Sequence, residues 1–255
     1  MALSFATVGH ISYGLAYLEN KKLPITCFMA DGSVDDACDA HKACSPDTAH
    51  YDIRLDHETK SIRNWVYDFD LLCVSEADLS WLGTSFFIGF LIGSAIFMWL
   101  SDIVGRKIII QIGLILHIVI LLVVLLLRGL PVLYIFLFVF GLRVPMAAHV
   151  GSLMTYEMVG QRVRSYATSV LTILDGTTNV WMPVFFYYAK DWRYLFWGLI
   201  GLVAIIFLIV TFLVPESPRI LIAKQKFAPA RRSYAFVARF NRRPMFQQPL
   251  QGELL

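Results

Sequence analysis

The sequence predicts an all-α membrane protein with six transmembrane helices and a large disulfide-bearing loop between the first two. Of its 255 residues, 57% are hydrophobic and only 16% are charged, whereas soluble domains average about 45–50% and about 25%. The mean hydropathy is +0.62 and the net charge is only +3. Because there is too little polar surface to cover a water-soluble fold, this composition argues against a soluble enzyme, a nucleic-acid-binding protein or a disordered chain.

The predicted spans follow from the length of the apolar stretches. Crossing about 30 Å of hydrocarbon takes roughly 20 mostly apolar residues. In chain order, the six predicted spans are residues 2–18, 81–100, 108–127, 132–156, 167–188 and 194–214. The first is short, but it lacks the basic start and small-residue cleavage site of a signal peptide ahead of Glu19, so we expect it to span.

Basic residues gather in the connections that six alternating spans place on one side of the membrane. Arg106 and Lys107 lie in one connection, Arg162 and Arg164 in another, and residues 215–255 hold eight basic residues against two acidic ones. Enrichment in Lys and Arg marks the cytoplasmic side, or the matrix side of a mitochondrial inner membrane. We therefore expect a multi-pass protein of the plasma membrane or of an organelle, with both termini on that side.

The loop at residues 19–79 is acidic and contains every cysteine of the chain. It holds thirteen acidic and six basic residues, together with Cys27, Cys38, Cys44 and Cys73. Cysteines confined to an outer loop suggest two disulfides in an oxidising compartment, with three possible connectivities. A zinc site is the alternative, but the spacing lacks any CxxC pair. We expect residues 1–214, loop included, to form the bundle, and residues 215–255 to form a basic inner tail with a short amphipathic helix.

Ionisable residues inside the spans are candidates for function, because a charge facing lipid costs several kcal/mol. Arg143, His149 and Asp175 are such residues. Arg143 and Asp175 lie roughly 21 and 17 Å from the inner ends of their helices at about 1.5 Å per residue. This similar depth predicts an ion pair between them; in the alternative, each finds a separate partner.

The fifth predicted span carries a polar stripe. Thr168, Thr172, Asp175 and Asn179 follow one another at steps of four, three and four residues, which places them on one helix face. A polar face at this depth can line a cavity near the membrane midplane where small molecules bind, and an anionic Asp175 there would favour cationic ones. The alternative is that this face contacts another protein or another helix of the bundle.

Several short motifs resemble those of the major facilitator superfamily. Residues 99–107 (WLSDIVGRK) are similar to its signature between the second and third helices. Residues 64–68 (NWVYD), 191–195 (DWRYL) and 215–221 (PESPRIL) resemble motifs of its organic ion transporter branch, in the same order. The resemblance implies that the chain has the fold of the N-terminal six-helix half of such a transporter.

The resemblance also implies a set of charged and structural residues at the inner side. Those of the signature loop are Asp102, Gly105, Arg106 and Lys107; those of the next inner connection are Glu157, Arg162 and Arg164; those after the sixth helix are Pro215, Glu216, Ser217, Pro218 and Arg219. In the family, the signature Asp sits against a helix N-terminus of the second half. The chain departs from the signature at Met98, where the family has Gly, and at Ile103, where it has Arg.

The length bears on the expected function, since the family needs two six-helix halves for alternating access. We expect a non-transporting accessory subunit of a larger membrane complex, contacting membrane lipids and contacting other subunits through its second and fifth helices and its basic tail. The alternative is a half-transporter for small organic ions, cations favoured, working as a dimer or with a second-half chain. No enzymatic activity, cofactor, metal or nucleic-acid partner is expected, and the motifs do not name a substrate.

Overall fold

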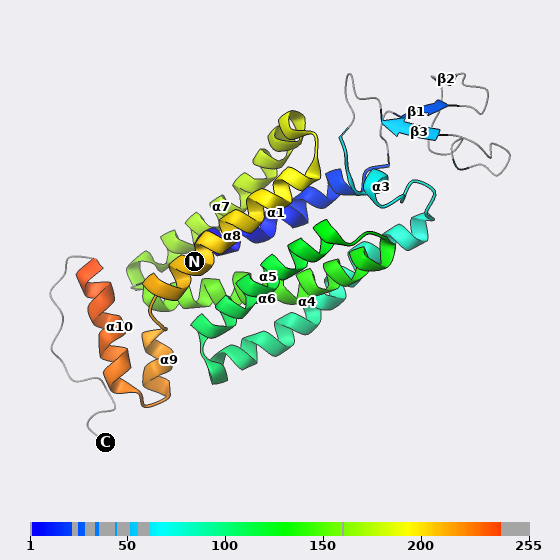
Figure 1. Ribbon diagram of the computed structural model, residues 1–255. Coiled ribbons are helices and arrows are strands. Elements are labelled where there is room, and N and C mark those ends of the chain that lie inside the picture. Colours follow the sequence, from blue (N-terminus) through cyan, green and yellow to red (C-terminus); the bar gives the residue numbers. More distant parts are fainter. Residues whose placement is uncertain are drawn as a thin grey trace.

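Long helices pack side by side in an elongated bundle (Figure 1). The computed structural model describes residues 2–21, 25–28, 34–35, 44, 52–55, 62–159 and 161–240. The bundle helices are α1 (Ala2–Leu18), α4 (Glu76–Val104), α5 (Arg106–Leu126), α6 (Leu130–Met158), α7 (Gln161–Ala189) and α8 (Trp192–Leu213). They lie where the sequence predicts the six spans, and α4, α6 and α7 extend further at both ends.

Four of these helices, α4, α5, α6 and α8, are long and apolar enough to cross a membrane, judged over the described residues. The predicted count of six spans is therefore supported for four of them. α1 has only 17 residues, and α7 carries polar side chains along its length. Both helices nevertheless belong to the bundle, because α1 packs against α6 and α7.

Glycines allow α4 and α6 to pack with their backbones in contact. A Cβ atom added at Gly93 would lie 2.5 Å from the carbonyl oxygen of Leu142, and one added at Gly89 would overlap the carbonyl of Phe138. Gly141 on α6 faces the carbonyl of Phe86 in the same way. These glycines remove the side chains that would hold the two helices apart.

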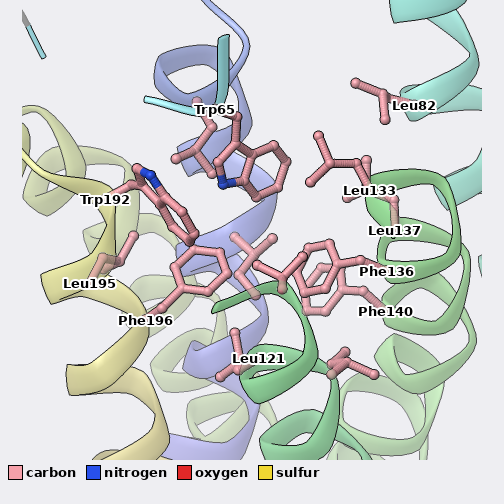
Figure 2. Close-up of a cluster of buried hydrophobic side chains, with 14 of the residues drawn as sticks. Trp65, Leu82, Leu121, Leu133, Phe136, Leu137, Phe140, Trp192, Leu195 and Phe196 are labelled. Atoms are coloured by element: carbon pink, nitrogen blue, oxygen red, sulfur yellow. The ribbon is translucent and has the colours of Figure 1, made fainter. Parts of the chain in front are cut away.

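An aromatic core fills the end of the bundle next to the large loop. Trp65 belongs to the short helix α3 (Trp65–Asp68) and is fully buried. Its ring centroid lies 5.7 Å from that of Phe136 on α6, 6.2 Å from Trp192 and 6.1 Å from Phe196 on α8. Figure 2 shows these side chains converging between the helices. The end of the loop is thereby anchored to the bundle by apolar burial.

The loop also contains strands, which the all-α prediction did not include. β1 (Ile25–Phe28) pairs antiparallel with β2 (Val34–Asp35) and with β3 (Asp52–Leu55), in the order β2-β1-β3. A disulfide joins Cys44 and Cys73, close to the start of α4. Cys38 and the side chain of Cys27 lie outside the described residues, so the second disulfide stays a prediction.

After α8 the described chain continues in α9 and α10, which lie at the opposite end of the bundle from the large loop (Figure 1). α9 (Pro218–Ala223) is short, and α10 (Phe227–Phe240) packs against it. Ala230 and Ser233 are buried, whereas Arg232 and Arg239 are exposed. α10 is therefore amphipathic, with a basic outer face.

Candidate functional site

At the basic end of the bundle, Arg106 connects α4, α5 and α6. Its Nη1 atom lies 2.5 Å from Glu157 Oε2, an ion pair without hydrogen-bond alignment, and its Nη2 atom lies 3.4 Å from Asp102 Oδ1. The hydroxyl of Ser217 donates to the same Glu157 oxygen at 2.5 Å. Three motifs far apart in the sequence therefore meet in one charge cluster.

The carboxylate of Glu216 caps the N-terminus of α5. Its Oε1 atom accepts from the backbone nitrogens of Arg106 at 3.2 Å and Lys107 at 3.1 Å, and also from that of Ser217. Gly105 directly precedes α5 and has no side chain that could cap the helix. It has φ +128°, and a Cβ atom there would lie 2.8 Å from Glu216 Oε2. The negative charge satisfies donors that the helix leaves unpaired and complements its dipole.

This role of Glu216 was not predicted from the sequence. The expected contact of Asp102 with a helix N-terminus of a second half stays a prediction. Within the described residues Asp102 contacts Arg106, and its side chain is largely exposed. A signal was present, because α5 begins after a glycine and so needs an external acceptor. The partner could not be identified from spacing, since Glu216 lies 110 residues after Arg106.

The other residues that the sequence analysis expects on the inner side lie at the same basic end of the bundle or close to it. The ammonium group of Lys107 donates to the carbonyl of Thr211 on α8 at 2.8 Å. Arg164 is half-buried near the start of α7, and Arg219 is exposed on α9. The side chain of Arg162 lies outside the described residues.

α1 separates the two charges that the sequence predicts as an ion pair. Arg143 Nη2 on α6 donates to Thr7 Oγ1 at 3.1 Å, whereas Asp175 Oδ2 on α7 accepts from the hydroxyl of Tyr13 at 2.9 Å. The predicted Arg143–Asp175 pair is not formed, and each group has its own partner on α1. Similar depth along α6 and α7 did not predict a contact, because α1 packs against both helices.

Gly9 lets α7 approach α1 at the level of Asp175. A Cβ atom added at Gly9 would lie 2.9 Å from Asp175 Oδ1 and would collide with the hydroxyl oxygen of Thr178. The carboxylate is therefore held between Gly9 and Tyr13 of α1.

The polar stripe of α7 is open to the surroundings of the bundle. Thr168, Thr172 and Asn179 are exposed, and Asp175 is half-buried. Neighbouring helices do not cover this face, so the stripe and its carboxylate form the candidate binding surface. His149, also a candidate, lies elsewhere: its ring packs edge-on at 5.6 Å from that of Phe90, between α6 and α4.

At the opposite end, Asp68 joins the large loop to α8. Its carboxylate accepts from Arg63 Nε at 2.9 Å and from Trp192 Nε1 at 2.7 Å, and lies 3.2 Å from Arg193 Nη2. Asp68 raises the pKa of the Arg63 guanidinium by accepting its hydrogen bond. The NWVYD and DWRYL motifs, noted in the sequence as separate resemblances, are therefore structural partners.

The arrangement defines a polytopic membrane protein with charged groups at both ends of an apolar bundle. Among the described residues, no group of three or more His, Cys, Asp or Glu side chains is placed to hold a metal ion. Residues 55–250 match the family model described as Major Facilitator Superfamily. The chain belongs to this superfamily.

Two similar proteins carry the names of transporters. The organic cation transporter-like protein of Drosophila melanogaster is 28% identical over 251 residues, which cover 95% of this chain and 42% of that protein. The galactose-proton symporter of Escherichia coli (strain K12) is 31% identical over 155 residues, covering 60% of this chain and 33% of the symporter. The chain thus spans less than half the length of these relatives. Neither name is that of an accessory subunit of a membrane complex.

Proposed function

We propose that this chain supplies one six-helix half of a transporter for small organic ions, with cations favoured. Six spans, those of α1 and α7 included, form the half, and a second six-helix unit completes the pathway. That unit is a second copy of the chain or a second-half polypeptide, because alternating access needs two repeats around a shared site.

The observation that carries the proposal is the uncovered polar stripe of α7. A half-buried carboxylate with three exposed polar neighbours is costly against lipid, so this face belongs next to water or protein. Tyr13 donates to Asp175 and fixes the position of its carboxylate. A cation entering the space between this half and the second six-helix unit would meet the negative charge of Asp175 near the middle of the bundle. Transporters built from two such repeats bind their substrates at this level.

The exposed face of α4 offers a second surface for the missing half. An open groove of about 490 Å³ runs along it, lined by Ser80, Gly83, Thr84, Phe87, Ile88 and Leu91. Its largely apolar lining suits a packed helix or lipid, whereas the polar stripe of α7 suits the substrate path.

The basic end of the bundle supports an orientation with both termini on the cytoplasmic or matrix side. α9, α10 and the charged cluster around Arg106 all lie at this end, and residues 218–240 contain six basic and no acidic side chains. The positive-inside rule places such an end on that side. The basic tail also suits anionic lipid headgroups or an acidic subunit.

Uptake measurements test the proposal. The purified chain is reconstituted into liposomes, and uptake of labelled tetraethylammonium is compared for the native chain, Asp175→Asn and a matched α7 control, Ser169→Ala, whose side chain lies off the stripe. Uptake by the native chain and control, but not by Asp175→Asn, supports a working dimer. Uptake seen only in cells, dependent on the chain and on Asp175, supports a second-half partner. Uptake in neither setting, or uptake insensitive to Asp175→Asn, overturns the proposal.

A further inference from the structure

Two buried nitrogen-containing side chains share one neighbour in the middle of the bundle. The guanidinium carbon of Arg143 lies 5.8 Å from the ring centroid of Phe140, and the ring of His117 on α5 lies 5.7 Å from the same ring. Both Arg143 and His117 are 0% exposed. Figure 2 shows Phe140 in the packed interior beside Phe136 and Leu137. These groups are therefore enclosed within the bundle, whereas the stripe of α7 is open.

Most of the hydrogen-bonding capacity of these two side chains is unused. Arg143 Nη2 donates to Thr7, but its Nε and Nη1 atoms and both ring nitrogens of His117 have no hydrogen-bond partner in the described part of the chain. Buried polar groups are normally hydrogen-bonded, and each exception calls for an explanation. Two such exceptions around one ring indicate a shared ligand.

The charge balance at this place is positive. Arg143 forms no ion pair with a carboxylate of the described residues, and Asp175 is held by Tyr13 on another helix. The ring of His117 lies in the neighbourhood of Arg143 and His10. A buried guanidinium without a counter-charge is strongly unfavourable, so the missing group is negative.

We propose that Arg143 and His117 bind a small monovalent anion, such as chloride, enclosed by α1, α5 and α6. Arg143 and His117 are completely buried, so the ligand must be small. The site offers one permanent positive charge, that of the Arg143 guanidinium, so the ligand carries a single negative charge. The anion accepts from an unused N–H of Arg143 and from one ring N–H of His117. This site does not depend on the proposed transport activity, since it lies within the bundle and not on its open face.

Thermal unfolding of the purified chain in detergent tests the site. Chloride and gluconate salts are compared at equal ionic strength, because gluconate is too large to enter. The midpoint of unfolding is expected to rise by about 5 °C in chloride at roughly a hundredfold excess over its dissociation constant. Arg143→Met and His117→Phe are expected to lose this rise, whereas Arg128→Met, which removes an exposed arginine between α5 and α6, keeps it.

Equilibrium binding of radioactive chloride to the native chain gives a second readout that needs no variant. One chloride bound per chain, displaced by bromide and not by gluconate, supports the site. Equal midpoints in chloride and gluconate, together with no bound chloride, overturn it. A rise of the same size in Arg143→Met also overturns it, because the anion then acts elsewhere.

Discussion

Glu216 Oε1 lies 3.1 Å from the backbone nitrogen of Lys107, and this contact joins the chain after α8 to the first turn of α5. The same oxygen accepts from the amides of Arg106 and Ser217. A single carboxylate therefore satisfies donors from two segments that lie more than 100 residues apart. The basic end of the bundle is held together by this cap and by the ion pair between Arg106 and Glu157.

Removing this cap is expected to destabilise the bundle. Glu216→Ala leaves the amides at the start of α5 without an acceptor and should cost about 2 kcal/mol. Glu216→Gln keeps an acceptor but loses the charge at the helix N-terminus and should cost about 0.5–1 kcal/mol. Thermal unfolding in detergent measures both. Glu76→Gln, at an exposed ion pair with Lys21, should change stability by less than about 0.5 kcal/mol; equal losses for all three variants would contradict the capping role.

Asp68 is expected to be the residue that holds the large loop on the bundle. Asp68→Asn leaves Arg63 and Arg193 without their counter-charge and should lower stability by about 2 kcal/mol. Hydrogen exchange of residues 62–75 should accelerate in this variant, since the single amide oxygen cannot accept from Arg63 on one side and from Trp192 on the other, as the two carboxylate oxygens do. Asp70→Asn is the matched control, because Asp70 is exposed and its φ of +55° suits asparagine. Unchanged exchange in Asp68→Asn would rule out the proposed link.

The glycines between α4 and α6 give a test within a single helix. Gly93→Ala places a methyl group against the carbonyl of Leu142 and should cost about 2 kcal/mol, because two packed backbones must separate. Gly83→Ala, ten residues earlier on α4, meets nothing within 4 Å. It should be neutral or stabilising by about 0.5–1 kcal/mol through reduced backbone entropy. Comparing the unfolding midpoints of the two variants checks this, and equal effects would show that close packing at Gly93 is unimportant.

The positions of the bundle helices could be predicted from the sequence because apolar run length is a local property. The signature-loop, NWVYD, DWRYL and PESPRIL motifs were likewise visible as short strings. What they contact was not visible, since Glu216 reaches α5 and Asp68 reaches Trp192 only after the chain has folded back on itself. The predicted pair of Arg143 and Asp175 was wrong for the same reason. Depth along a helix axis can be counted in residues, but the identity of the helix lying between two side chains cannot.

The loop was the least predictable part of the described chain. Its short strands pair over two to four residues, too few for an alternating apolar pattern to emerge. The cysteine count suggested disulfides without their connectivity, and the structure supplies one pair, Cys44 with Cys73.

Glu19 is expected to make stability depend on pH. It directly follows α1, its Oε1 atom is buried without a hydrogen-bond partner in the described residues, and burial raises its pKa from 4.5 to about 7. The unfolded chain therefore releases this proton near pH 4.5 while the folded chain keeps it up to about pH 7, so ionisation favours unfolding across that interval. The contribution of Glu19 is present below pH 4.5, is lost as the pH rises to about 7, and is constant above that.

Glu19→Gln removes this ionisation and provides the measurement. The difference in unfolding midpoint between Glu19→Gln and the native chain should grow in favour of the variant from pH 4.5 to about pH 7 and then level off. Glu76→Gln should show no such trend, because its carboxylate is exposed. Since other carboxylates titrate identically in both chains, their effects cancel in the difference. A difference that stays constant from pH 4.5 to 8 would mean that Glu19 ionises equally easily in the folded and unfolded chains, and that its burial does not disfavour the charged form.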